Sequence, residues 1–360
     1  MKLSFIAKVG FVTFAFCLNL SAMALCSDDL SIKKANTSTV TNAATKSRKL
    51  IITIDTEAAT DRAPGDHVDK LIWGKFADKE FGISRMMDIA EKHGVKLTFF
   101  VDFCEVYLYP GKFEKVCAEI IKRGHDLQLH YHAMNLPRKF WGEHGDPKAD
   151  KLPRNEYEFD KVESDILMKF LVETATKMGA KTPLACRAGA FYYNREQLES
   201  MKENGIAMSF NYSLWAPPQK YLGINFNLFE WSNGVIEVPL SYLNISGRLT
   251  PFEFNNTYFK DISKFDNFIN TFYNQYGDEA VLVMLMHSWS FLEMDKKTRY
   301  FEYKDERLEK EFDDLLTMYQ KQGEIITATD LYNLISKNKD LIKVKVNLNA
   351  LDYSRNHLKK

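Results

Sequence analysis

The sequence has few cysteines and no excess of charge of either sign. Five cysteines in 360 residues are too few for a disulfide scaffold, so a hydrophobic core has to stabilise the chain. Lysine and arginine together number 48, as do aspartate and glutamate, which leaves no net field to attract nucleic acid or an anionic membrane. The composition therefore favours a globular protein with an uncharged partner and argues against nucleic-acid binding.

Hydrophobic runs long enough to cross a membrane are also lacking. The apolar run from Val9 to Leu20 has 12 residues, follows two lysines and precedes Ser-Ala-Met-Ala. This pattern predicts a cleavable signal peptide over residues 1–24, with no transmembrane segment after cleavage. An uncleaved membrane anchor is the alternative, whereas Leu25 is too large for a lipid-attachment site at Cys26. We expect a periplasmic or secreted protein of a Gram-negative bacterium.

The rest of the chain divides by composition. Residues 25–48 are rich in serine, threonine, asparagine and lysine without apolar periodicity, which predicts a disordered linker. Residues 49–340 are expected to form one catalytic domain and residues 341–360 a C-terminal tail. Within the domain, Cys104 and Cys117 are compatible either with a disulfide bond or with buried free thiols.

Apolar strand patterns alternate with helical patterns along this domain. The expected strands cover residues 50–55, 96–103, 125–132, 182–187, 206–211, 234–240, 280–287 and 324–328. The expected helices cover residues 80–93, 111–123, 155–179, 194–204, 261–276 and 304–322, several of them followed by glycine. Such alternation indicates an α/β fold with a parallel sheet. No glycine-rich phosphate loop follows the first strand, so a barrel is favoured over a doubly wound sheet.

Four side chains at the ends of two expected strands point to a metal site. Asp55 and Glu57 lie two residues apart, as do His130 and His132, so each pair faces one side of its strand. In barrels, the side chains that carry chemistry gather at the carboxyl ends of the strands. Carboxylate with imidazole is a ligand set for Zn²⁺ or another divalent ion such as Co²⁺, Ni²⁺ or Mn²⁺.

Two further strand ends carry reactive groups. His287 follows seven apolar residues, and its pKa near neutrality suits a general acid, although a hydrogen-bonded core histidine is the alternative. Arg187 ends another strand, where a guanidinium can stabilise and orient a carboxylate.

In this order, the segments ITIDTE, GHDLQLHYH, CRAGAFYY, EVPL and MLMHSWSF resemble the five motif regions of the polysaccharide deacetylases, the NodB-homology or carbohydrate esterase family 4 enzymes. The resemblance spans roughly residues 49–330. It implies a distorted (β/α)₇ barrel and a metal-dependent hydrolase that removes N-acetyl, or less often O-acetyl, groups from an amino-sugar-containing surface or lipid-linked polysaccharide. A non-catalytic glycan-binding barrel and a small-molecule amidase of the same fold are the alternatives.

The resemblance also implies roles for individual residues. Asp55 matches the general base, His287 the general acid and Arg187 the partner of Asp55, while Glu57, His130 and His132 match the metal ligands. The chain departs from the family pattern at three places. Thr56 separates the two acids, the histidine pair is H-x-H rather than H-x-x-x-H, and Asn211 stands where an acid that orients the catalytic histidine is usual. Glu237 is a candidate substitute for that acid, and which of Asp55 and Glu57 binds the metal is left open.

Aromatic side chains near the strand ends can stack on sugar rings or pack in the core. Of these, Tyr193 and Trp289 are expected to line the substrate pocket.

Overall fold

The computed structural model describes residues 47–149, 156–182, 184–213 and 227–351. The predicted signal peptide and nearly all of the predicted linker lie outside these residues. Within them, no helix combines the length and the apolar character needed to cross a membrane.

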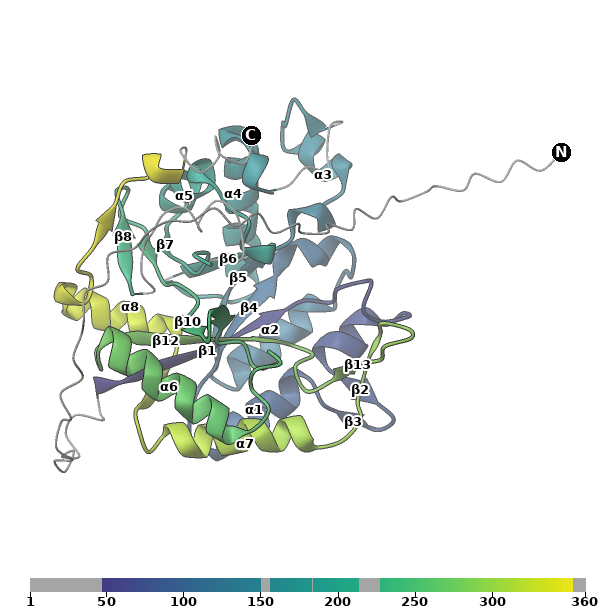
Figure 1. Ribbon diagram of the computed structural model, residues 1–360. Helices are drawn as coiled ribbons and strands as arrows, with labels where there is room; N and C mark the ends of the chain where they lie inside the picture. Colours follow the sequence, from purple (N-terminus) through teal and green to yellow (C-terminus); the bar gives the residue numbers. More distant parts are fainter. Residues whose placement is uncertain (1–46, 150–155, 183, 214–226, 352–360) are drawn as a thin grey trace, which may run out of the picture. The chain divides into compact units, whose positions relative to one another are not determined.

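A mostly parallel sheet forms the centre of the described structure (Figure 1). Its hydrogen-bonded order is β12-β1-β4-β5-β6-β7-β9-β8-β16, and β15 pairs with β1 as well. Each segment expected to form a strand contains one. These strands are β1 (Lys49–Thr56), β4 (Thr98–Asp102), β5 (Asp126–Tyr131), β6 (Leu184–Ala188), β7 (Ile206–Ser209), β9 (Ile236–Glu237), β12 (Val281–His287) and β15 (Glu324–Ile326).

The segment that follows β9 closes the sheet by bonding to β12, the strand at its other edge. The amide of Ser241 donates to Val283 O. The amide of Leu285 donates to Phe252 O, and the amide of Phe254 donates to Leu285 O. The sheet therefore curves round on itself through residues 241–254 rather than through one more regular strand. This closure gives the strands an inner and an outer side, as the barrel prediction requires.

Helices lie around the strands and connect them (Figure 1). The six expected helices are present as α1 (Ile83–Lys92), α2 (Phe113–Lys122), α4 (Lys161–Lys177), α5 (Arg195–Glu203), α6 (Ile262–Tyr276) and α7 (Arg307–Tyr319). Gly94, Gly124, Gly179 and Gly205 each follow a helix with positive φ, the left-handed conformation that lets the chain turn sharply into the next strand.

The period of two along β1 separates the core from the functional side. Leu50, Ile52 and Ile54 pack into the large apolar cluster between the strands and the helices. Ile51 belongs instead to a second apolar cluster, to which β4, β6, β7, β9 and β12 also contribute, inside the barrel. Thr53, Asp55 and Glu57 continue that inner side toward the carboxyl end of the strand. The apolar inner cluster therefore ends where the polar side chains begin.

Several elements were not expected from the sequence. They are α3 (Arg138–Glu143), α8 (Ala328–Lys337), β8 (Phe229–Trp231), β16 (Lys345–Val346) and the hairpins β2–β3 (Lys75–Phe76 and Lys79–Glu80), β10–β11 (Tyr242–Ile245 and Arg248–Pro251) and β13–β14 (Glu293–Met294 and Phe301–Glu302). Strand β16 lies within the segment assigned to the C-terminal tail and pairs with β8. Cys104, Cys117 and Cys186 are buried free thiols, so Cys104 and Cys117 are not bridged.

Candidate metal centre

Strand register places the predicted site residues side by side. Asp55 of β1 is paired with His287 of β12, and His130 of β5 is paired with Arg187 of β6. Parallel pairing without slippage keeps the carboxyl ends of these strands level, so the polar residues that end each strand meet at one end of the barrel.

A buried ion pair joins the first and fourth predicted strands. Arg187 Nη1 donates to Asp55 Oδ1 at 2.7 Å, and Nη2 donates to Thr53 Oγ1 at 2.9 Å. Arg187 is 1 % exposed and its guanidinium lies 4.5 Å from the centre of the Phe100 ring. A fixed guanidinium that donates to a neighbouring carboxylate holds it in one orientation. The structure therefore fixes the Asp55 carboxylate in one orientation at the carboxyl end of β1.

Glu57, His130 and His132 converge on one point. Glu57 Oε2 lies 2.7 Å from His132 Nε2 and 3.6 Å from His130 Nε2. The two imidazole rings meet edge to face, with centroids 5.1 Å apart. One ligand atom from each of the three residues lies within 4.8 Å of the others, and Asp55 is not part of this group. Glu57 rather than Asp55 is thus the carboxylate in the position of a metal ligand.

The tautomer of His130 indicates what this group is built to hold. Nδ1 lies 2.9 Å from Arg187 O, and because a carbonyl can only accept, Nδ1 carries the proton. In the neutral ring, Nε2 presents a lone pair, and this buried atom has no hydrogen-bond partner among the described residues. Burial by itself would lower the pKa of His130, but the Asp55 and Glu57 carboxylates outweigh burial and raise that pKa, so a cation beside Nε2 is favourable. A buried lone pair aimed at a carboxylate is unfavourable unless a cation lies between them. The donor set therefore fits a divalent metal ion.

The ionisation of the ligands without metal agrees with this reading. Burial opposes charge on both Glu57 and His132, but the interaction with His132 holds the pKa of Glu57 well below its usual range. Burial by itself would lower the pKa of His132, but the Glu57 carboxylate outweighs burial and raises that pKa to about 10. In the absence of metal, a proton on His132 therefore takes the place of the cation, and metal binding has to release it.

A glycine makes room for the second imidazole. A Cβ atom at Gly189 would lie 2.4 Å from both Cε1 and Nδ1 of His132, closer than atoms can approach. Gly189 directly follows β6 and sits in a turn in which Ala190 and Phe191 both have positive φ, an arrangement that costs backbone energy. The loop after Arg187 thus shapes the pocket for His132.

Two buried acids behind the site were missed by sequence reasoning. Asp102, the last residue of β4, is fully buried and accepts hydrogen bonds from the amides of His132 and Cys104. Glu105 is 1 % exposed and accepts from the amide of Ala58, the residue after Glu57. Burial raises the pKa of both carboxyl groups, that of Glu105 well above its usual range. The alternation of side chains along a strand, which indicated Asp55, would also have indicated Asp102. Asp102 is the last residue of TFFVD and lies on the same side of β4 as Phe100.

His287 lies at the edge of this group. Its Nε2 is 4.0 Å from Glu57 Oε1, and its side chain is about a quarter exposed. The imidazole is therefore partly exposed and lies next to the carboxylate that faces the two histidines.

Neither Asn211 nor Glu237 forms a hydrogen bond or an ion pair with His287. Glu237 is fully buried and accepts from the amides of Asn211 and Tyr212 and from Trp231 Nε1, each at 2.8 Å. Asn211 Oδ1 accepts from the amide of Ala188, the residue after Arg187. Asn211 thus ties the end of β6, which carries Arg187, to the segment after β7, and Glu237 ties β9 to that segment and to β8. We assign both residues to holding these strands together rather than to orienting His287.

The two aromatic residues expected to line the pocket lie in different surroundings. Tyr193 is completely buried within the main apolar cluster and offers no surface to a substrate, so we assign it to core packing. Trp289 is 9 % exposed and stacks on His287.

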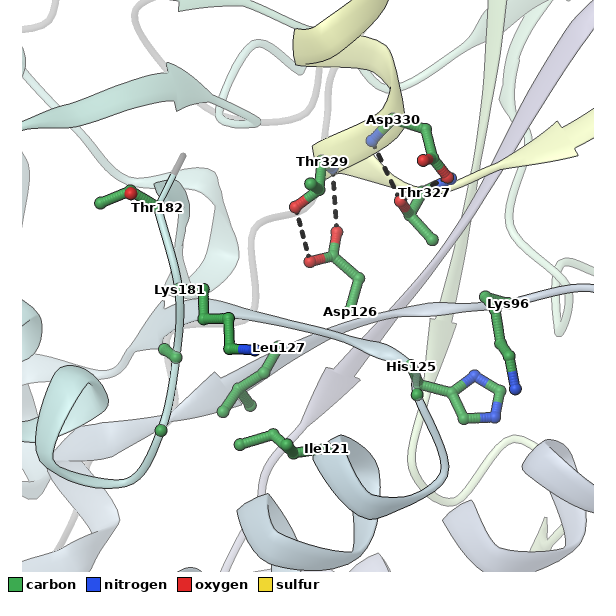
Figure 2. A pocket seen from close by; sticks show the side chains of 13 residues that line it. Lys96, Ile121, His125, Asp126, Leu127, Lys181, Thr182, Thr327, Thr329 and Asp330 are labelled. Carbon is green, nitrogen blue, oxygen red and sulfur yellow. Dashed lines mark hydrogen bonds between the residues drawn. The ribbon is translucent and has the colours of Figure 1, made fainter.

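A cavity at the opposite end of the barrel is not part of this site. It has a volume of about 430 Å³ and includes His125 and Asp126, which precede or begin β5 (Figure 2). Asp126 accepts from the amide and hydroxyl of Thr329 at the start of α8, and Thr98 accepts from the amide of Ala328. The first amides of α8 are therefore already paired with protein groups, and this end of the barrel is structural.

Comparison with known proteins identifies the fold. No protein-family model matches the sequence, and no curated protein matches it. A crystal structure assigned as a polysaccharide deacetylase from Mycobacterium smegmatis aligns with 84% of this chain and 93% of its own at 14% identity and a TM-score of 0.52. The structure of the Bc1960 peptidoglycan N-acetylglucosamine deacetylase aligns with 79% of this chain and 87% of its own at 12% identity, with a TM-score of 0.41. A family 4 carbohydrate esterase pseudoenzyme from Bacillus anthracis aligns with 84% of this chain and 67% of its own at 10% identity, with a TM-score of 0.40. The first of these shows that the chain has the fold of the polysaccharide deacetylases, which confirms the expected (β/α)₇ barrel type.

Proposed function

We propose that this protein is a metal-dependent hydrolase that removes N-acetyl, or O-acetyl, groups from an amino-sugar-containing bacterial polysaccharide. The convergence of Glu57, His130 and His132 beside the Asp55–Arg187 pair and His287 supports this proposal most directly. The predicted signal peptide adds that the protein acts in the periplasm or outside the cell.

The residues of this chain divide the reaction between them. A divalent ion bound by Glu57, His130 and His132, with Zn²⁺ as the leading candidate, would polarise the acetyl carbonyl and a water molecule. Asp55 takes a proton from that water while the water oxygen bonds to the carbonyl carbon. Arg187 keeps the Asp55 carboxylate aligned. His287 delivers a proton to the sugar nitrogen as the carbon–nitrogen bond breaks. The products are acetate and a free amino sugar.

Acetate release from N-acetylhexosamine oligomers tests the proposal. The purified protein should lose activity on treatment with a chelator and recover it with Zn²⁺ or another first-row divalent ion. His130→Ala and His132→Ala should abolish both bound metal and turnover, whereas His93→Ala, at a partly buried pair with Asp313, should keep both. Activity that ignores the chelator would contradict the proposal. Glycan binding without acetate release by the metal-loaded protein would favour a non-catalytic binding barrel, and turnover confined to small amides would favour an amidase.

A further inference from the structure

The imidazole of His287 is held by stacking rather than by a hydrogen bond. Among the described residues, no side chain forms a hydrogen bond with the ring, and the Glu57 carboxylate stands 4.0 Å away. The Trp289 indole lies parallel to it, with an angle of 18° between the planes and 5.0 Å between centroids. A general acid needs a fixed direction toward the leaving atom, and this stack supplies one.

Trp289 is itself fixed from two directions. Its ring contacts Phe301 of β14, with centroids 5.6 Å apart, in a small apolar cluster with Ala63, Leu71 and Leu292. The backbone that carries His287 and Trp289 forms a tight turn. In it, Ser290 Oγ accepts from the amide of His287, and Trp289 O accepts from the amide of Leu292. With 9 % of its surface exposed, the indole has no open face for a sugar ring.

We propose that Trp289 is the positioning residue of the general acid, in the place that Asn211 and Glu237 do not fill. The inference rests on the proposed function, since it assigns His287 the protonation of the leaving group. It moves Trp289 from the substrate-contacting role expected from the sequence to a role that acts through His287.

Substrates with different leaving groups separate this role from a structural one. An amide nitrogen needs a proton as it departs, whereas 4-nitrophenolate leaves an acetyl ester without one. Trp289→Ala should therefore lower kcat on an N-acetylhexosamine oligomer about 10- to 100-fold while changing kcat on 4-nitrophenyl acetate less than about threefold, with KM nearly unchanged. Trp289→Phe, which keeps a stacking ring, should restore most of the amide activity. Leu292→Ala, which trims the same apolar cluster, should lower thermal stability without a selective loss on the amide.

Two kinetic results would overturn the inference. Equal losses on both substrates would make Trp289 a general structural residue, and a raised KM with unchanged kcat would make it a sugar platform.

A measurement that needs no turnover separates this inference from the proposed function. Stacking on an indole shifts the ring-proton NMR signals of His287 upfield, and His287→Gln identifies those signals. The shift should vanish in Trp289→Ala and persist in Trp289→Phe. If the wild-type protein releases no acetate, the proposed function fails while the stack can still be confirmed; if the shift is absent from the wild-type protein, the inference fails.

Discussion

Arg187 and Asp55 are 132 residues apart in the chain and form a 2.7 Å ion pair inside the barrel. The side chains of Arg187 and Asp55 are 1 % and 7 % exposed, so water solvates neither of them appreciably. Their pairing links β1 to β6 across the barrel, so the stability of the barrel depends on both side chains.

Removing one member of this pair should destabilise the protein strongly. Arg187→Met leaves the Asp55 carboxylate buried and unpaired, which should lower the free energy of unfolding by about 3–5 kcal/mol. Adding Asp55→Asn should recover part of that loss, because the uncompensated charge disappears. Arg195→Met, at a half-exposed pair with Glu199, should change it by less than about 1 kcal/mol. Urea unfolding measures all three, and a double variant no more stable than Arg187→Met would contradict the pairing argument.

A methyl group at residue 189 should disturb the metal site. Gly189→Ala places a Cβ atom 2.4 Å from the His132 ring, so the imidazole has to move away from Glu57. We expect at least a tenfold loss of metal affinity and of acetate release. Gly65→Ala, where a Cβ atom would meet nothing within 4 Å, is the matched control. Unchanged metal content in Gly189→Ala would show that His132 is not a ligand.

Asp102→Asn should weaken metal binding without unfolding the protein. The amide keeps an oxygen that can accept from His132 N, but the negative charge behind the histidine is lost and an NH₂ group meets Asn135. Loss of such supporting groups typically lowers metal affinity 10- to 100-fold. Competition with a chelator measures the affinity. Asp126→Asn removes a buried carboxylate at the other end of the barrel and should leave the affinity unchanged.

His125 should make the fold sensitive to acid. The ring is buried, Nδ1 accepts from the amide of Leu97, and burial together with the Lys96 charge lowers the pKa to about 4. Because this pKa lies below the ordinary histidine value of about 6.5, the contribution of His125 to stability is present above about pH 6.5 and is lost as the pH falls toward 4.

The variant His125→Asn tests this acid sensitivity, since its carbonyl oxygen can replace Nδ1 as the acceptor. Between pH 7 and pH 4 the wild-type protein should lose more unfolding free energy than the variant, by up to roughly 3 kcal/mol. Urea unfolding at both pH values gives the difference. Parallel losses in the two proteins would remove His125 as the cause.

Local patterns predicted most of the elements because they depend on neighbours in the sequence. Alternating apolar runs, helical periodicity and glycines such as Gly94 and Gly124 each act within a few residues, and the strands and helices that they indicated are present. The unpredicted hairpins β2–β3 and β13–β14 differ, since strands of two residues carry almost no periodic signal.

The site divides in the same way. The sequence alone determined that Asp55 and Glu57, and likewise His130 and His132, share a side of their strands, because the side chains of an extended chain alternate. Only the tertiary structure decided that Glu57 lies against the histidines while Asp55 pairs with Arg187. It also decided that Asp102 and Gly189 lie against His132 and that Trp289 stacks on His287. Those contacts depend on the register between strands and on the path of the loops beyond them, and both are set by packing between residues far apart in the chain.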